Sequence, residues 1–167
     1  MKEVTIIFCD RNKLEVCSQK LGNVLDSGKW AQLLPNESTK EKLLRKNISS
    51  KEAGVIIRSG GSLNEHKQCL HTCSNLDNSA LATAQWLKAQ GLEPQQCHII
   101  NTLPLHHVSG LLPWWRSRCW GAEHHWIKPS LLHLPQQLEK ISHELISKRP
   151  GPLITSLVPT QLNRLMN

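Results

Sequence analysis

Long apolar runs are missing from this chain of 167 residues. The first ten residues, MKEVTIIFCD, hold an apolar stretch that is too short for a signal peptide and has an acidic residue on each side. No other segment approaches the roughly 20 consecutive apolar residues that a membrane-spanning helix needs. We therefore expect a protein without a membrane span and, by default, a cytoplasmic location.

Acidic residues are few, and aromatic residues are fewer still. The chain has 13 Asp and Glu against 20 Lys and Arg, a formal net charge of +7 at pH 7, and no tyrosine. The densest basic group lies within residues 40–51, is interrupted by Glu41 and is separate from the six tryptophans. Nucleic-acid-binding surfaces usually combine basic with aromatic side chains, so we interpret this group as a solvated helix face and expect no nucleic-acid partner. The excess positive charge favours an anionic substrate such as a nucleotide.

Disulfide bonds are not expected either, because the six cysteines of an intracellular chain of this size are by default reduced and mostly buried. Only Cys69, His71 and Cys73 have the spacing of metal ligands, and no second Cys/His pair stands at zinc-finger distance from them. On a strand these three side chains share a face without any metal. We therefore expect no metal site, and a metal-binding module at Cys69, His71 and Cys73 remains only an alternative. Histidines that could join it in three dimensions are His98, His106, His107, His124 and His125.

Segments with strand and helix spacing alternate along the chain, without an internal repeat, a low-complexity tract or a linker. Strands are predicted over 4–9, 55–57, 97–100, 125–127 and 152–158, and helices over 14–25, 75–90, 111–120, 131–147 and 160–166, with a short helix near 38–44. We place Pro113 in the first turn of its helix, where a proline is tolerated. The predicted fold class is α/β, a mostly parallel sheet with helices on both faces. The length favours one domain over residues 1–167.

A loop rich in glycine and serine follows the strand predicted at 55–57. Residues 58–67 read RSGGSLNEHK, so that a lysine closes the run. Small residues let backbone amides approach a bound group closely, and a strand that ends in such a turn can direct amides and a cation at phosphate oxygens. The alternative is an ordinary solvated turn, which has a similar composition.

A second loop, PLHHVSG at residues 104–110, follows the strand predicted at 97–100. In open parallel sheets ligands bind beyond the carboxyl ends of the strands, so the two loops could open on one crevice. The first loop would then hold phosphate, and His106 or His107 would lie across the crevice as a neutral imidazole that bonds or shapes a substrate. The alternative for each histidine is a packed ring bonded to a backbone carbonyl.

Three segments in this order resemble the acyl-adenylate-forming enzymes, the AMP-binding superfamily. They are the SGGS turn at 59–62 with its following lysine, PLHHVSGL at 104–111 and SLVPTQL at 156–162, and the last two are the more specific. Within the superfamily the chain is most similar to the o-succinylbenzoate–CoA ligases of menaquinone and phylloquinone synthesis. The resemblance extends over about residues 54–166.

The resemblance implies a ligase that acts in two steps. A carboxylic acid attacks the α-phosphate of ATP to give an acyl-adenylate and pyrophosphate, and the thiol of coenzyme A then displaces AMP. Mg²⁺ offsets the charge of the triphosphate. No catalytic residue is assigned within this chain.

The same resemblance implies the binding residues. Those expected to contact ATP phosphates are Ser59, Gly60, Gly61, Ser62 and Lys67. Those expected near the acid substrate are His106, His107, Ser109, Gly110 and Thr160. Three further residues could line a pocket for an aromatic acid, although tryptophans at helical spacing more often belong to a core or interface: Trp114, Trp115 and Trp120.

The chain also departs from the family pattern. The family loop continues with glycine and then Lys-Pro-Lys-Gly, whereas this chain has residues 63–68, LNEHKQ, in which Glu65 repels phosphate. The family's adenine-binding segment, ribose-binding aspartate and C-terminal domain with the catalytic lysine have no counterpart in these residues. We therefore expect the truncated N-terminal domain of such a ligase, with the C-terminal catalytic domain absent. It would be either a truncated gene product or one half of a split enzyme, in which a partner chain supplies the missing part. The alternative is a non-catalytic remnant that self-associates or acts as a binding or interaction module.

Overall fold

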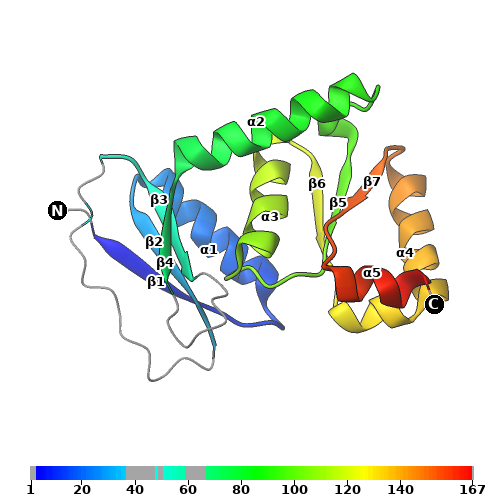
Figure 1. Ribbon diagram of the computed structural model, residues 1–167, viewed down its shortest axis with the longest axis horizontal. Helices are drawn as coiled ribbons and strands as arrows, with labels where there is room; N and C mark the ends of the chain where they lie inside the picture. Colours follow the sequence, from blue (N-terminus) through cyan, green and yellow to red (C-terminus); the bar gives the residue numbers. More distant parts are fainter. Residues whose placement is uncertain (1–2, 37–47, 49–50, 59–66, 167) are drawn as a thin grey trace. The chain divides into compact units, whose positions relative to one another are not determined.

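The computed structural model describes residues 3–36, 48, 51–58 and 67–166 (Figure 1). These residues form two compact units. The first comprises Met1–Asn78 with Pro104–Leu111, and the second comprises Ser79–Leu103 with Leu112–Asn167. The short helix predicted near 38–44 falls outside the described residues. The prediction of one domain over residues 1–167 stays a prediction.

The first unit contains a four-stranded sheet in the order β1-β2-β3-β4. Strands β1 (Val4–Cys9), β2 (Trp30–Pro35) and β3 (Gly54–Arg58) are parallel, and β4 (Gln68–Thr72) runs antiparallel to β3. Helix α1 (Leu14–Asp26) connects β1 to β2 and packs against both strands (Figure 1). The parallel pairs require this kind of long crossover connection, because a short turn cannot return the chain to the starting edge.

Helix α1 has the spacing that its sequence predicts. Cys17, Leu21 and Leu25, four residues apart, are all buried against the sheet. The helix ends at Asp26, and Gly28 just beyond it has a φ of +73°, in the left-handed region. The amide of Gly28 donates to the carbonyl of Leu25 (2.9 Å), and the amide of Lys29 donates to the carbonyl of Val24 (3.2 Å). This pair of bonds is the Schellman motif, which explains why the helix stops there.

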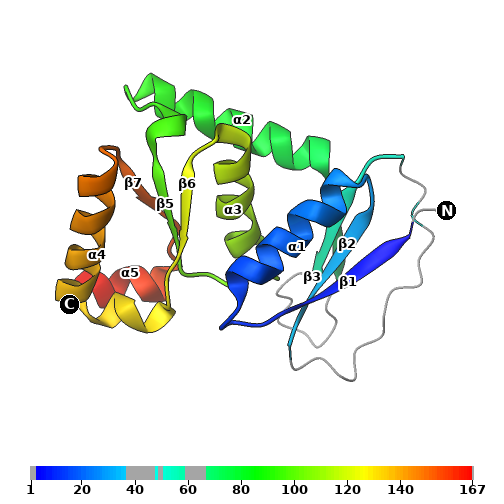
Figure 2. The same cartoon turned by 180° about the vertical axis from the view of Figure 1, so that it is seen from behind.

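The second unit contains a three-stranded parallel sheet in the order β6-β5-β7. Its strands are β5 (His98–Asn101), β6 (Glu123–Trp126) and β7 (Leu153–Thr155). Helices α3 (Val108–Trp120) and α4 (Pro135–Lys148) connect them and lie on opposite sides of the sheet (Figure 2). This is the arrangement that two right-handed crossovers of opposite direction produce. The remaining elements are α2 (Cys73–Ala89), α5 (Pro159–Met166) and the 3₁₀ segments Pro94–Gln96 and Pro129–His133.

The predicted α/β class with mostly parallel strands is confirmed, although the described strands form two sheets. Strands β2 and β4 were not among those predicted. In β2 five of six residues are buried, so the strand lacks the alternation of apolar and polar residues that marks a half-exposed strand. Helix α3 begins three residues earlier than predicted, so the placement of Pro113 in its first turn is wrong. Pro135 separates the helix predicted over 131–147 into a 3₁₀ turn and α4.

Cysteines contribute to packing in both units. Cys9 and Cys17 are buried in the first unit, and Cys97 is buried in the second. Burial, with a smaller contribution from the neighbouring Cys17, raises the pKa of the Cys9 thiol to about 12, so this thiol is protonated at neutral pH.

In the part of the chain that the structure describes, no helix has both the length and the apolar character needed to cross a membrane.

Gly54 is the tightest position of the first sheet. A Cβ atom there would lie 2.5 Å from the carbonyl oxygen of His71 on β4 and 2.6 Å from Cη2 of Trp30 on β2. We expect Gly54→Ala to lower the free energy of unfolding by about 1–3 kcal/mol, because two strands would have to separate locally. Urea denaturation followed by circular dichroism measures this, with the exposed substitution Gln85→Ala on α2 as control. Equal stability of the two variants would contradict the packing described here.

Candidate functional site

The carboxyl ends of β1, β2 and β3 lie at one edge of the first sheet because these strands are parallel. Arg58 at the end of β3 pairs with Gln68 at the start of β4. The end of β3 and the start of β4 therefore both lie at this edge. Residues 59–66, which include the predicted phosphate-binding Ser59, Gly60, Gly61 and Ser62, lie outside the described residues.

Three basic residues mark this edge. Arg58 is partly buried at the end of β3, and Lys67, directly before β4, is exposed. Arg11 lies two residues beyond the end of β1 and is also exposed. The acidic residue in this turn is Asp10. Its Oδ1 accepts a hydrogen bond from the backbone amide of Asn12 (2.9 Å), which stabilises the turn that precedes α1. The edge therefore offers guanidinium and ammonium groups to an anion.

His106 and His107 stand in a closed turn before α3. The amide of His107 donates to the carbonyl of Pro104 (3.0 Å), and the His107 carbonyl accepts the amides of Gly110 (3.0 Å) and Leu111 (2.9 Å). The centroids of the two imidazole rings are 4.4 Å apart. His106 is buried and His107 is exposed, so only His107 presents its ring to solvent.

The electrostatic surroundings of His107 connect this turn with the edge of the sheet. Partial burial and the positive charge of Arg11 both lower the pKa of His107 below its ordinary range. A neutral imidazole at pH 7 can donate one hydrogen bond and accept another. The influence of Arg11 also means that the end of β1 and the His107 turn, both in the first unit, are neighbours.

The other predicted substrate-binding residues are divided between the two units. Ser109 is partly buried and Gly110 buried, both in the first turn of α3 within the first unit. Thr160 is exposed at the start of α5 in the second unit. Beside it, Oε1 of Gln161 accepts the amide of Val158 (3.1 Å), which satisfies a donor at the beginning of that helix. Their binding roles stay predictions.

The tryptophans of α3 serve packing. Trp114 and Trp115 are buried, and their ring centroids lie 5.9 Å apart in an edge-to-face arrangement. The indole Nε1 of Trp120 donates to the carbonyl of Ala80 (3.1 Å), which ties α3 to α2 within the second unit. This is the core alternative that the helical spacing of the tryptophans left open.

Metal-ligating side chains gather at a place that the sequence did not single out. Among the described residues, Cys69, His71 and Cys73 do not form a group of neighbouring ligand atoms, whereas His98, Glu123 and His125 do. The strand predicted at 125–127 begins at Glu123 in the structure. The signal that could have found this group is the spacing of Glu123 and His125, two residues apart as on one face of a strand, with His98 in a neighbouring predicted strand.

No protein-family model matches the chain, and a search of curated proteins finds no match. Solved structures do match over nearly the whole chain. They show the α/β fold of the N-terminal part of the adenylate-forming acyl-CoA ligases.

Among these structures is o-succinylbenzoate coenzyme A synthetase from Bacillus subtilis. Its complex with AMP is 19% identical with a TM-score of 0.62, covering 98% of this chain and 50% of that one. Its complex with ATP and magnesium is 17% identical with a TM-score of 0.55, covering 98% of this chain and 40% of that one. A malonyl-CoA ligase with methylmalonyl-CoA and AMP bound is 13% identical with a TM-score of 0.51, and the match covers 97% of this chain and 48% of that one. The chain thus spans half or less of these proteins, and the likeness establishes the fold.

The charge of Arg11 gives a test of the geometry around His107. We expect Arg11→Gln to raise the pKa of His107, because a repelling charge is removed, and Lys20→Gln on α1 to leave that pKa unchanged. NMR titration of the imidazole resonances measures both. Since the folded state holds the pKa of His107 down, its contribution to stability should be lost as the pH falls below about 6.5. If the pKa of His107 is unchanged in Arg11→Gln, then Arg11 does not lie close enough to His107 to influence it, and the geometry described here is wrong.

Proposed function

We propose that this chain is part of an acid–CoA ligase that activates a carboxylate with ATP. The first unit binds the triphosphate of Mg·ATP at the carboxyl edge of its sheet. The acyl-adenylate formed there then reacts with the thiol of coenzyme A. Because the chain spans half or less of the solved relatives, we expect CoA-ester formation only together with the remainder of such a ligase.

The observation that carries this proposal is the placement of Arg11, Arg58 and Lys67 at the edge where β3 ends and β4 begins, on either side of the glycine- and serine-rich segment. Phosphate oxygens are bound by arginine as a rigid fork of donors and by lysine as a mobile point charge, and this edge carries both kinds. The formal net charge of +7 adds a long-range attraction for a polyanion.

The residue types fit a division of labour. The backbone amides and hydroxyls of Ser59, Gly60, Gly61 and Ser62 would surround phosphate oxygens, while Lys67 offsets their charge. The neutral imidazole of His107 would bond the acid substrate or the wall of its pocket, with Ser109 and Gly110 beside it. Mg²⁺ would be bound to the triphosphate of ATP, and coenzyme A would bind as a co-substrate.

The finer proposal concerns the acid. The PLHHVSGL and VPTQL segments resemble the o-succinylbenzoate–CoA ligases, so an aromatic dicarboxylic acid of menaquinone or phylloquinone synthesis is the expected substrate. A second carboxylate on the substrate would also suit an edge that carries an excess of cations. The structural matches to an o-succinylbenzoate synthetase and a malonyl-CoA ligase support the class of carboxylate-activating enzyme.

Titration with Mg·ATP tests the proposal. We expect weak but saturable binding that Lys67→Ala weakens about 10-fold or more, because an ion-paired hydrogen bond to phosphate is lost. Lys88→Ala at the end of α2 is the matched control, since it removes the same charge from the second unit. Isothermal titration calorimetry at low ionic strength measures the three affinities. Absence of binding to the unaltered chain, or equal affinities of all three proteins, would remove the support for a phosphate site.

A non-catalytic interaction module is the second candidate, and exposed apolar side chains on α2 favour it. Trp86 and Leu81 are 62% and 58% exposed within the second unit. Such residues are costly in water and often mark interaction surfaces. We expect Trp86→Gln to lower the average mass measured by light scattering if α2 mediates self-association. A cooperative melt and the mass of a monomer for both proteins would argue against this candidate.

A further inference from the structure

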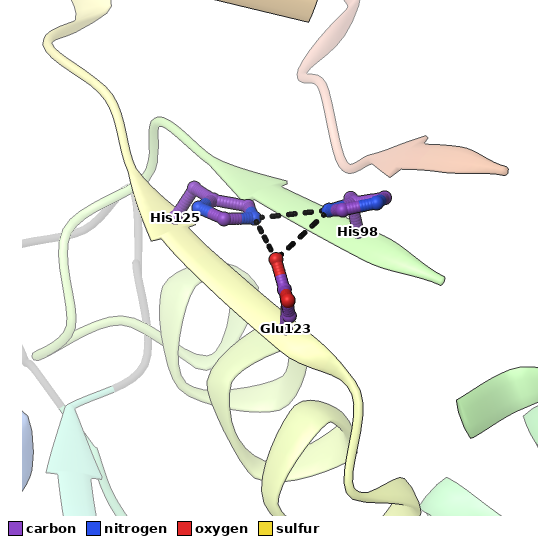
Figure 3. A group of neighbouring side chains, drawn as sticks. All are labelled: His98, Glu123 and His125. Carbon is purple, nitrogen blue, oxygen red and sulfur yellow. Dashed lines mark hydrogen bonds and ion pairs between the residues drawn. The ribbon is translucent and has the colours of Figure 1, made fainter. Parts of the chain in front are cut away.

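Three metal-ligating side chains meet on one face of the second sheet (Figure 3). The parallel register pairs His98 at the start of β5 with Glu123 at the start of β6. His125 follows Glu123 by two residues, so its side chain leaves the sheet on the same face. In Figure 3 one nitrogen of each histidine and one oxygen of Glu123 point toward a common centre.

The distances between these atoms are those of one face of a tetrahedron. Nδ1 of His98 lies 3.3 Å from Nε2 of His125 and 3.2 Å from Oε2 of Glu123, and the latter two atoms are 3.5 Å apart. Ligands bound to zinc at about 2.0–2.1 Å in a tetrahedron are roughly 3.3–3.4 Å apart. Octahedral ligands at about the same bond length would be only roughly 2.8–3.0 Å apart, as around Mg²⁺. The spacing therefore favours a tetrahedral ion.

The ring of His98 is held in the state that a metal requires. Its Nε2 lies 2.7 Å from the carbonyl oxygen of Arg149. A carbonyl can only accept, so Nε2 carries the proton, and in the neutral ring the lone pair is on Nδ1, the atom that faces the centre. A histidine ligand whose other nitrogen donates to a backbone carbonyl is the usual outer-shell arrangement of protein metal sites.

The same residue orients Glu123. Nη1 of Arg149 lies 3.5 Å from Oε1 of Glu123, and Nη2 donates to the carbonyl of Gln95 (2.9 Å). Oε1 is thereby engaged and Oε2 faces the centre. Nearby, Gly151 lies against the backbone of Gln96, where a Cβ would overlap the Gln96 carbonyl. The segment around Arg149 therefore supports two of the three ligands from outside the ligand set.

We propose that His98 Nδ1, Glu123 Oε2 and His125 Nε2 bind one divalent ion of the zinc type. Two histidines and one carboxylate form a common three-residue zinc set, in which a water takes the fourth position. The His98 side chain is wholly buried, whereas those of His125 and Glu123 are 23% and 41% exposed, so an ion can enter from solvent and keep a water ligand. This site lies in the second unit and does not depend on the proposed ATP site.

The competing explanation is a hydrogen-bonded trio without metal, in which Nε2–H of His125 donates to Glu123 or to Nδ1 of His98. The two explanations differ in what the trio does when zinc is supplied. A bound ion would link β5 to β6 and raise the thermal stability of the folded chain by mass action, whereas a metal-free trio would bind no ion.

The test uses the protein without an affinity tag. Bound metal is removed with a chelator, and the protein is then dialysed against zinc. We expect about one equivalent of Zn²⁺ per chain, a higher melting temperature, and with Co²⁺ the intense visible absorption of a tetrahedral site. Glu123→Gln and His125→Gln should each weaken zinc binding about 100-fold or more, because each removes one ligand of the ion. Neither side chain is deeply buried, so both variants should fold. His143→Gln, which alters an exposed histidine on α4 beside Glu139, should bind like the unaltered chain.

Circular dichroism of the metal-free variants verifies that each is folded. Unaltered zinc affinity in both Glu123→Gln and His125→Gln would overturn the proposal, because it would place the ion on other residues such as the cysteines. So would the absence of stoichiometric zinc in the unaltered chain. Loss of ATP binding without loss of zinc binding would affect only the proposed ligase function.

Discussion

Parallel pairing of neighbouring strands is the constraint on which both candidate sites depend. Parallel strands bring their carboxyl ends to one edge and need a crossover between them, here α1 in the first sheet and α3 and α4 in the second. In the first unit this gathers Arg11 and Arg58, which are far apart in the sequence, at one edge. In the second unit the register of β5 and β6 sets His98 opposite Glu123.

Different neighbours determine the protonation of the histidines at the two candidate sites. Near the first sheet, partial burial and the charge of Arg11 lower the pKa of His107, which favours the neutral ring at pH 7. In the second unit, a backbone carbonyl from Arg149 determines which nitrogen of His98 carries the proton. The first histidine is thus governed by the charge of a neighbouring side chain, and the second by a hydrogen bond to the backbone.

Much of the secondary structure could be predicted from the sequence because its signals are local. The apolar spacing of α1 and the glycine that ends it lie within one short segment, and β1, α2 and α5 were predicted within about two residues. Strand β2 escaped prediction because burial on both faces removes its alternation, and that burial depends on distant segments. Pro113 was misplaced because α3 begins at Val108, three residues before the predicted start, and so holds the proline in its interior.

The sequence by itself determined the alternation of strands and helices, and the residue types available at the PLHHVSG turn and at the serine- and glycine-rich connection. These are properties of neighbouring residues. Only the tertiary structure decided which side chains meet. His98 and His125 are 27 residues apart, and the carbonyl that orients His98 lies 51 residues away. The local cluster of Cys69, His71 and Cys73 looked more like a ligand set than these distant residues did, because spacing along a chain says little about proximity across a strand register.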